Sequence, residues 1–197
     1  MQYGPYYPSN VTGTGWTNPG DAAGAPDGNS ATATVNRDEA TGLLTADTFV
    51  RASNPTTAFG SNALLEVDNS PVKHAFLRFD VTGVGSHPVA SARLRLQAAN
   101  VAGAASDSGG RVHRTTCGWN ESTLTWNTPP PPIDPGVLAS SGAVAPGQVV
   151  EFEVKAALTA GDGAYCFALD STSGNGVDYG SSAGPGLAPA LVITLAP

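Results

Sequence analysis

The chain has 197 residues, of which only 13% are charged, and it contains 24 glycines and 16 prolines. This composition is typical of a turn-rich β protein, and the length allows one all-β domain with a full core, or a domain with an appendage. The formal net charge of −7 argues against nucleic acid as a general partner, and no apolar run approaches the roughly 20 residues of a membrane span.

Residues 1–45 differ in composition from the rest of the chain. Three tyrosines and Trp16 lie among Gly, Pro, Asn and Thr, and SATATV (30–35) alternates as a strand does. The first residues lack the basic and apolar regions of a signal peptide, so a processed secreted protein and a virion protein are alternatives. We expect residues 1–45 to form an extended arm whose strand pairs with its own domain or with another subunit; a disordered linker is the alternative.

From Ala46 onward, short runs alternate between apolar and polar residues. We expect the first strand to start near Phe49 and the second to follow at residues 64–67. In HAFLRFDV (74–81) every second residue from Ala75 is apolar, so Phe79 should face the core while Arg78 faces outward.

Four further strands follow the same reasoning. Residues 92–96 should turn Leu94 inward and Arg93 and Arg95 outward, and similar alternation occurs at 111–113, 151–154 and 166–169. The closing ALVITLA has so few polar positions that we expect it to be buried on both faces. Eight or more short strands between Gly/Pro/Asn/Ser turns predict an all-β, two-sheet antiparallel β-sandwich of jelly-roll type, spanning residues 46–197.

WNESTLTWNTPP (119–130) contains two of the three tryptophans of the chain. Its alternation predicts a short half-buried strand that places Leu124 and Trp126 on one face. Prolines 129–132 cannot donate to a sheet ladder and should end the strand. We expect Trp119 and Trp126 to be buried anchors of the core; stacking on a sugar is the alternative.

An ordered set of segments allows a comparison with known domains. The segments are ADTFVRAS (46–53), NPTTAFGSNALLEV (54–67), AFLRFDV (75–81), SARLRLQAAN (91–100), WNESTLTWNTPP (119–130), FEVKAAL (152–158), DGAYCFAL (162–169) and PALVITL (189–195). In this order and spacing they resemble the DNRLRE-type carbohydrate-binding module, a β-jelly-roll carried by secreted polysaccharide-degrading and adhesive proteins. The resemblance covers about residues 46–197 and implies a non-catalytic glycan-binding domain.

Two details qualify this resemblance. Where the family usually has Asp-Val-Thr, this chain has Glu153 and Lys155 around Val154, so a role of that acid or hydroxyl does not transfer. GWTNP (15–19) and GAPDGNSATA (24–33) resemble the opening of galactose-binding-like and phage tail jelly-rolls, but the rest of such a domain does not follow.

The sequence offers little catalytic chemistry, and we expect no enzyme. It contains no G-x-S-x-G elbow and no P-loop, and its three histidines are far apart and lack metal-ligand spacing. A glycosidase needs two carboxylates facing each other across a cleft, and nothing in the sequence brackets Asp80, Glu121 or Glu153 in that way.

A structural calcium ion is the only cofactor that we consider. Asp47, Asp68 and Asp80 are candidate ligands, because Ca²⁺ takes carboxylate and backbone carbonyl oxygens where they meet at a sheet edge. The alternative for each is an ordinary turn or capping role.

Basic residues are concentrated between residues 73 and 114, which hold six basic and two acidic side chains. Arg78, Arg93 and Arg95 point outward from strands that we expect to be neighbours, so they would form one basic stripe. Lys73, His113 and Arg114 are candidates for its margin. The planar guanidinium binds carboxylates through two hydrogen bonds, so the stripe suits an acidic polysaccharide. The alternative is a solvated face with cross-strand pairs to Glu or Asp.

Cys117 and Cys166 are the only cysteines. An even count in a domain that looks extracellular predicts a disulfide between them.

Two functions therefore remain open. The first is a non-catalytic extracellular module that binds a glycan, with an acidic polysaccharide favoured. The second is a structural subunit of an extracellular assembly, such as a phage virion or a filament, in which residues 1–45 pack on neighbouring chains.

Overall fold

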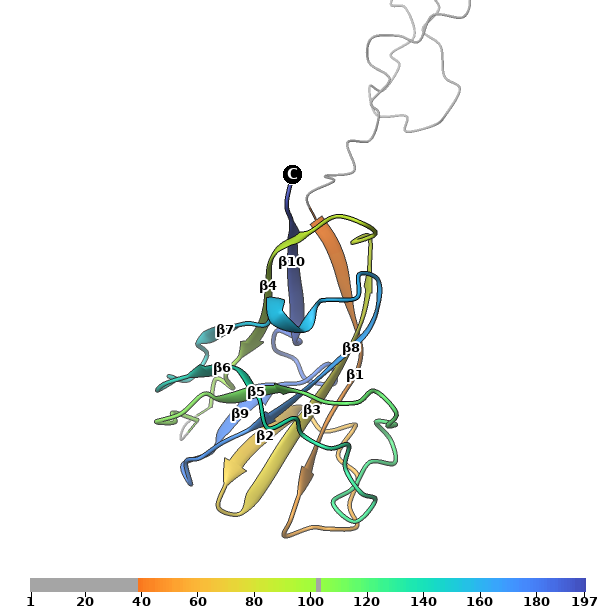
Figure 1. Cartoon of the computed structure of the whole chain (residues 1–197). Coiled ribbons are helices and arrows are strands. Elements are labelled where there is room, and N and C mark those ends of the chain that lie inside the picture. The colour runs from red at the N-terminus through yellow and green to blue at the C-terminus, as the bar shows by residue number, and fades with distance from the viewer. Residues whose placement is uncertain (1–38, 102–103) are drawn as a thin grey trace, which may run out of the picture. The chain divides into compact units, whose positions relative to one another are not determined.

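The computed structural model describes residues 39–101 and 104–197. Its elements are ten antiparallel strands and one 3₁₀ turn (Figure 1). They are β1 (Glu39–Arg51), β2 (Leu64–Asn69), β3 (Val72–Thr82), β4 (Val89–Gln97), β5 (Gly110–Arg114), β6 (Val137–Ser141), β7 (Val149–Glu153), η1 (Lys155–Ala157), β8 (Gly163–Asp170), β9 (Val177–Gly180) and β10 (Ala190–Leu195). The predicted all-β antiparallel β-sandwich is confirmed, whereas SATATV lies outside the described residues.

The strands are hydrogen-bonded in the order β6-β5-β8-β3-β1-β10-β4-β7, and β2 pairs with both β3 and β9. We call β6-β5-β8-β3-β1 the first sheet and β1-β10-β4-β7 the second sheet. Strand β1 belongs to both, because residues 39–42 pair with β10 and residues 41–51 pair with β3. In Figure 1 the start of β1, in orange, accordingly lies beside β10. A register shift between Leu44 and Ala46 marks a bulge in β1.

The main core lies between the two sheets and follows the predicted alternation. Phe79 and Leu94 are fully buried, and the ring of Phe79 meets that of Phe167 edge-on at 6.2 Å between centroids. Strand β4 alternates buried and exposed side chains, so Arg93 and Arg95 point to solvent as predicted. Each fully buried Phe or Leu side chain contributes about 1.5–3 kcal/mol of transfer free energy.

The predicted start of the first strand and the predicted burial of the last strand are wrong. The first strand begins at Glu39 rather than near Phe49, and its first residues pair with β10. The last strand is not buried on both faces. It alternates, with Leu191 and Ile193 inward and Val192 38% exposed, because none of the described residues covers the outer face of the second sheet.

Residues 115–136 form a covering segment over the outer face of the first sheet. Trp119 and Leu124 are buried there against Val50, Phe76 and Ala168 in a second apolar cluster. Trp126 is only partly buried, in the same cluster. The predicted anchoring role therefore describes Trp119 better than Trp126.

The predicted strand within residues 119–130 is wrong, because the covering segment turns at this place. The carbonyl of Asn120 accepts the N–H groups of Thr123 (3.3 Å) and Leu124 (2.9 Å). The N–H of Thr128 donates to the Thr125 hydroxyl (3.0 Å), and the N–H of Thr125 donates to the Thr128 hydroxyl (2.7 Å). These side chain–backbone bonds compete with strand pairing.

Cys117 and Cys166, the pair for which the sequence predicts a disulfide, are bonded, with 5.4 Å between their Cα atoms. Cys166 lies on β8 and Cys117 near the start of the covering segment. The bond closes a loop with a sequence separation of 49. On the chain-entropy model, closing a loop of this length contributes roughly 3–4 kcal/mol to stability.

Candidate functional site

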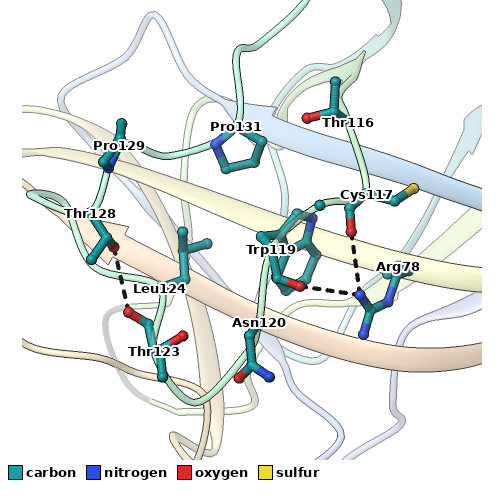
Figure 2. Close-up of a pocket in the computed structure, with 11 residues that line it drawn as sticks. Arg78, Thr116, Cys117, Trp119, Asn120, Thr123, Leu124, Thr128, Pro129 and Pro131 are labelled. Atoms are coloured by element: carbon teal, nitrogen blue, oxygen red, sulfur yellow. Dashed lines mark hydrogen bonds between the residues drawn. The ribbon is translucent and has the colours of Figure 1, made fainter.

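A pocket of about 610 Å³ lies where the covering segment meets the outer face of β3 (Figure 2). We call it the Arg78 pocket. Its lining residues are Arg78, Thr116, Cys117, Gly118, Trp119, Asn120, Thr123, Leu124, Thr128, Pro129 and Pro131. Arg78 comes from β3, and all the others come from the covering segment. The volume falls within the usual range for ligand pockets, about 300–1,000 Å³.

Arg78 holds the rim of this pocket in place. Its Nη1 donates to the carbonyl oxygens of Trp119 (3.1 Å) and Cys117 (3.4 Å), as Figure 2 shows. Its Nε lies 3.3 Å from the Thr45 hydroxyl, and its guanidinium carbon lies 5.4 Å from the centre of the Trp119 ring. Within the described parts of the chain, Arg78 forms no ion pair with a carboxylate. Its positive charge is therefore not neutralised by a direct partner there.

The rest of the lining is uncharged and includes several polar side chains. Asn120 uses its side-chain oxygen to accept the N–H (2.9 Å) and the hydroxyl (2.7 Å) of Ser122. Its amide nitrogen has no acceptor among the described residues, and neither do the exposed hydroxyls of Thr116 and Thr123. These groups and the arginine can donate hydrogen bonds to a ligand that carries hydroxyl or carboxylate oxygens.

Trp119 forms the wall of the pocket behind Arg78. Only 8% of its surface is exposed, and its ring is tilted against Phe76 with 6.2 Å between centroids. The buried indole N–H has no acceptor in the described part of the chain. An unpaired buried donor costs about 1–3 kcal/mol, which the burial of this large ring offsets.

The basic stripe that the sequence predicts does not exist as one surface. Arg78 lies on β3, and β1 and β10 separate β3 from β4, which carries Arg93 and Arg95. The alternation placed all three side chains outward correctly, but their strands are not neighbours.

Arg93 and Arg95 are paired with acids across the β4–β7 ladder. Arg95 Nη2 lies 2.7 Å from Glu151 Oε1, and Arg93 lies 3.4 Å from Glu151 and 4.0 Å from Glu153. The hydrogen bond from Arg95 lowers the pKa of Glu151. These two arginines therefore follow the alternative of a solvated face with cross-strand pairs.

The three residues predicted for the margin of the stripe lie in different environments. Lys73 Nζ lies 2.9 Å from Glu66, and Arg114 is exposed at the end of β5. His113 is buried, with Nε2 3.0 Å from the Asp170 carboxylate and Nδ1 2.8 Å from the Asp134 carbonyl. None of the three lines the Arg78 pocket.

Asp170 forms a partly buried polar cluster with His113 and Arg111. Arg111 donates to both of its oxygens, at 2.8 and 2.6 Å. Burial raises the pKa of Asp170, but the hydrogen bonds from Arg111 and His113 outweigh it and hold the pKa below its usual value.

The three candidate calcium ligands do not come together. Asp47 accepts the N–H of Ser182 at 2.7 Å, Asp68 accepts that of Ser70 at 3.1 Å, and Asp80 is exposed. In the described ranges, no three or more His, Cys, Asp or Glu side chains are grouped so that they could hold a metal ion. For Asp68, the bond to the N–H two residues later is the turn role considered as the alternative.

Thr116, Asn120 and Thr123 were not predicted as pocket residues; for Asn120 and Thr123 the reason is the strand expected within residues 119–130. A usable signal was present. Asn120 stands two residues before Ser122, and Thr125 stands three residues before Thr128. In both spacings a side-chain oxygen can accept a backbone N–H and stabilise a turn.

Two comparisons complete the description of the site. Residues 38–195 match the family model of carbohydrate-binding module family 96. A search of curated proteins finds no match. Separately, the described residues contain no helix of the length and hydropathy that crossing a membrane requires.

Proposed function

Because the chain belongs to carbohydrate-binding module family 96, we propose that it is a non-catalytic extracellular module that binds an acidic polysaccharide in the Arg78 pocket. The family match covers both sheets and the covering segment, so the pocket lies within the matched region. The predicted DNRLRE-type domain and this family agree in the coarser statement that the domain binds carbohydrate.

The observation that carries the proposal is which basic residues form ion pairs and which do not. Of the eight in the described ranges, five form ion pairs: Arg51, Lys73, Arg93, Arg95 and Arg111. Among the three others, Arg78 alone lines the Arg78 pocket. A guanidinium that makes no direct ion pair in the described part of the chain, set among uncharged lining residues, is suited to a carboxylate on a sugar.

The surrounding groups support a sugar rather than an isolated anion. The Thr116 and Thr123 hydroxyls and the Asn120 amide provide donors of the kind that recognise ring hydroxyls, and Pro129 and Pro131 add apolar surface. A second hollow of about 590 Å³ beside η1 is lined mainly by apolar groups and contains both Lys155 and Glu153. That hollow therefore lacks the net positive charge that an acidic glycan needs.

An extracellular location is part of the same proposal. The Cys117–Cys166 disulfide supports it, because such bonds persist in oxidising compartments. The alternative of a structural subunit relied on residues 1–45, most of which lie outside the described part of the chain.

The test is a calorimetric titration of a polyuronate into the full chain and two variants. Thr123→Glu adds a negative charge to the pocket at a side chain that makes no hydrogen bond among the described residues. We expect affinity to fall roughly five-fold, as a like charge at a solvated site costs about 1 kcal/mol. Thr172→Glu, at an exposed threonine that follows β8 and does not line the pocket, is the matched control and should bind as the wild type does.

A neutral polysaccharide of similar length serves as the second ligand. The proposal expects weaker binding of this ligand and no effect of Thr123→Glu on it. Equal affinity of all three proteins for the polyuronate would remove the Arg78 pocket as the binding site.

A further inference from the structure

The two sheets differ in how their outer faces are covered. The covering segment buries the outer face of the first sheet. No described residue covers the outer face of the second sheet at β10, β4 and β7. We call this second surface the open face. Its outward residues are Val192, Thr194, Arg93, Arg95, Gln97, Val149, Glu151 and Glu153.

Charges on the open face are arranged in two opposite rows. Strand β4 carries Arg93 and Arg95, with side chains 54% and 45% exposed. Strand β7 carries Glu153 and Glu151 directly opposite them in register. The four charges cancel, so the face is bipolar rather than basic, and a polyanion would gain little from it.

Apolar side chains flank these rows. Among the described residues six large apolar side chains are exposed, and three of them lie on or beside the open face: Val149 (42%), Leu187 (56%) and Val192 (38%). Val149 is paired in register with Gln97, whose side-chain oxygen accepts the N–H of Leu187 at 3.1 Å. Val149 and Leu187 therefore both lie next to Gln97, at one end of the charged rows.

We propose that the open face binds a second copy of the chain in a two-fold symmetric dimer. An axis that runs along the strands, between β4 and β7, places β4 of one copy over β7 of the other. Each arginine then faces a glutamate of the partner copy, because the two rows are in register. An axis across the strands would instead place arginine over arginine, so the charges select the first arrangement.

The same arrangement also covers apolar surface. It brings Val149 of one copy over Gln97 of the other, next to Leu187, and it does so twice because of the symmetry. Aligned packing of two β-sheets at a separation of about 10 Å is a common geometry for such faces. The Arg78 pockets lie over the other sheet of each copy, so both remain open and a dimer presents two of them to one polymer.

The experiment is sedimentation equilibrium of the full chain between about 1 µM and 1 mM, the range of weak to moderate association. The wild type should shift from monomer to dimer, and high salt should oppose the shift because it screens the charge rows. Arg93→Glu/Arg95→Glu gives a face with only acidic charges, and Glu151→Lys/Glu153→Lys gives one with only basic charges. Each variant alone should remain monomeric at concentrations where the wild type dimerises, whereas an equimolar mixture should dimerise.

Thermal unfolding first checks that both variants fold. Should one of them not fold, amide chemical-shift changes of the wild type on dilution replace it, and these should be confined to β4, β7 and the residues around Leu187. A wild type that stays monomeric up to 1 mM overturns the proposal. So does dimerisation that both charge variants retain, or a face whose amides respond to polyuronate but not to protein concentration.

Discussion

Asp170 is the residue on which three side-chain bonds converge under the covering segment. Its two oxygens accept from Arg111, and one of them also lies 3.0 Å from His113 Nε2. His113 in turn bonds the carbonyl of Asp134 in the covering segment. The cluster therefore links β5, β8 and the covering segment through one carboxylate.

Asp170→Asn should lower the free energy of unfolding at pH 7 by about 2 kcal/mol, because it leaves a half-buried guanidinium without its charge partner. The pKa of Asp170 is lowered in the folded state, so its contribution is present above the unfolded-state value of 3.8 and is lost as pH falls through the lower folded value. Urea unfolding should thus show the difference between variant and wild type at pH 7, and a smaller difference near pH 3. Asp80→Asn is the control, because Asp80 is exposed and forms no ion pair with another described residue. A pH-independent difference would contradict the assignment.

At the scale of the element, β1 defines where the domain begins. Its first four residues pair with β10, and the arm expected from the sequence included them. The chain from Glu39 onward contains both sheets and their core.

We therefore expect residues 39–197 to unfold cooperatively as an isolated fragment, and residues 46–197 to be less stable by about 2–4 kcal/mol. The shorter fragment loses the β1–β10 pairs and buried Ala40, and it exposes the edge of β10. Thermal unfolding of both fragments checks this, and equal midpoints would show that residues 39–45 add nothing. Sedimentation of the full chain beside 39–197 then tests the predicted role of residues 1–45 in assembly separately from the open face, which both proteins retain.

Alternation along the sequence was sufficient to place Phe79 and Leu94 in the main core, but it did not show that the covering segment also buries Phe76 and Ala168 on the outer face of the first sheet. It could not predict which strands are neighbours, because pairing between distant segments leaves no mark on local periodicity. For this reason Arg78 was grouped with Arg93 and Arg95, although two strands separate them. In residues 119–130 the alternation was present without a strand, because side-chain bonds around Asn120 and Thr125 form turns instead.

At the scale of the whole molecule, positive charge is scarce and mostly paired. The chain carries a formal net charge of −7, and of the basic residues that the structure describes only Arg78 lines the Arg78 pocket. The molecule should therefore recognise an acidic glycan locally, without attracting polyanions over long distances.

The salt dependence of polyuronate binding distinguishes this pocket from a basic stripe. A site with one cationic contact should give a slope of about −1 in a plot of log affinity against log salt concentration, since each contact releases roughly one counterion. The six basic residues predicted for the stripe would give a slope several times steeper. Titrations at four or five salt concentrations measure this slope, at a protein concentration where the wild type is monomeric. Arg93→Gln/Arg95→Gln is the control and should leave the slope unchanged. If the wild type gives a steep slope and the control variant a smaller one, polyuronate binds to Arg93 and Arg95 on the open face and not to the Arg78 pocket.

The pairing of β1 with β10 also has a mechanical consequence. Glu39 at the start of β1 lies opposite Thr194 near the end of β10, so the backbone enters and leaves this domain at adjacent strand ends. Hydrogen bonds in an antiparallel pair run perpendicular to the strands. Tension applied to the backbone on either side of the domain therefore acts along these hydrogen bonds. It breaks them one after another, instead of loading all of them at once. We expect the β1–β10 pairing to separate first under force.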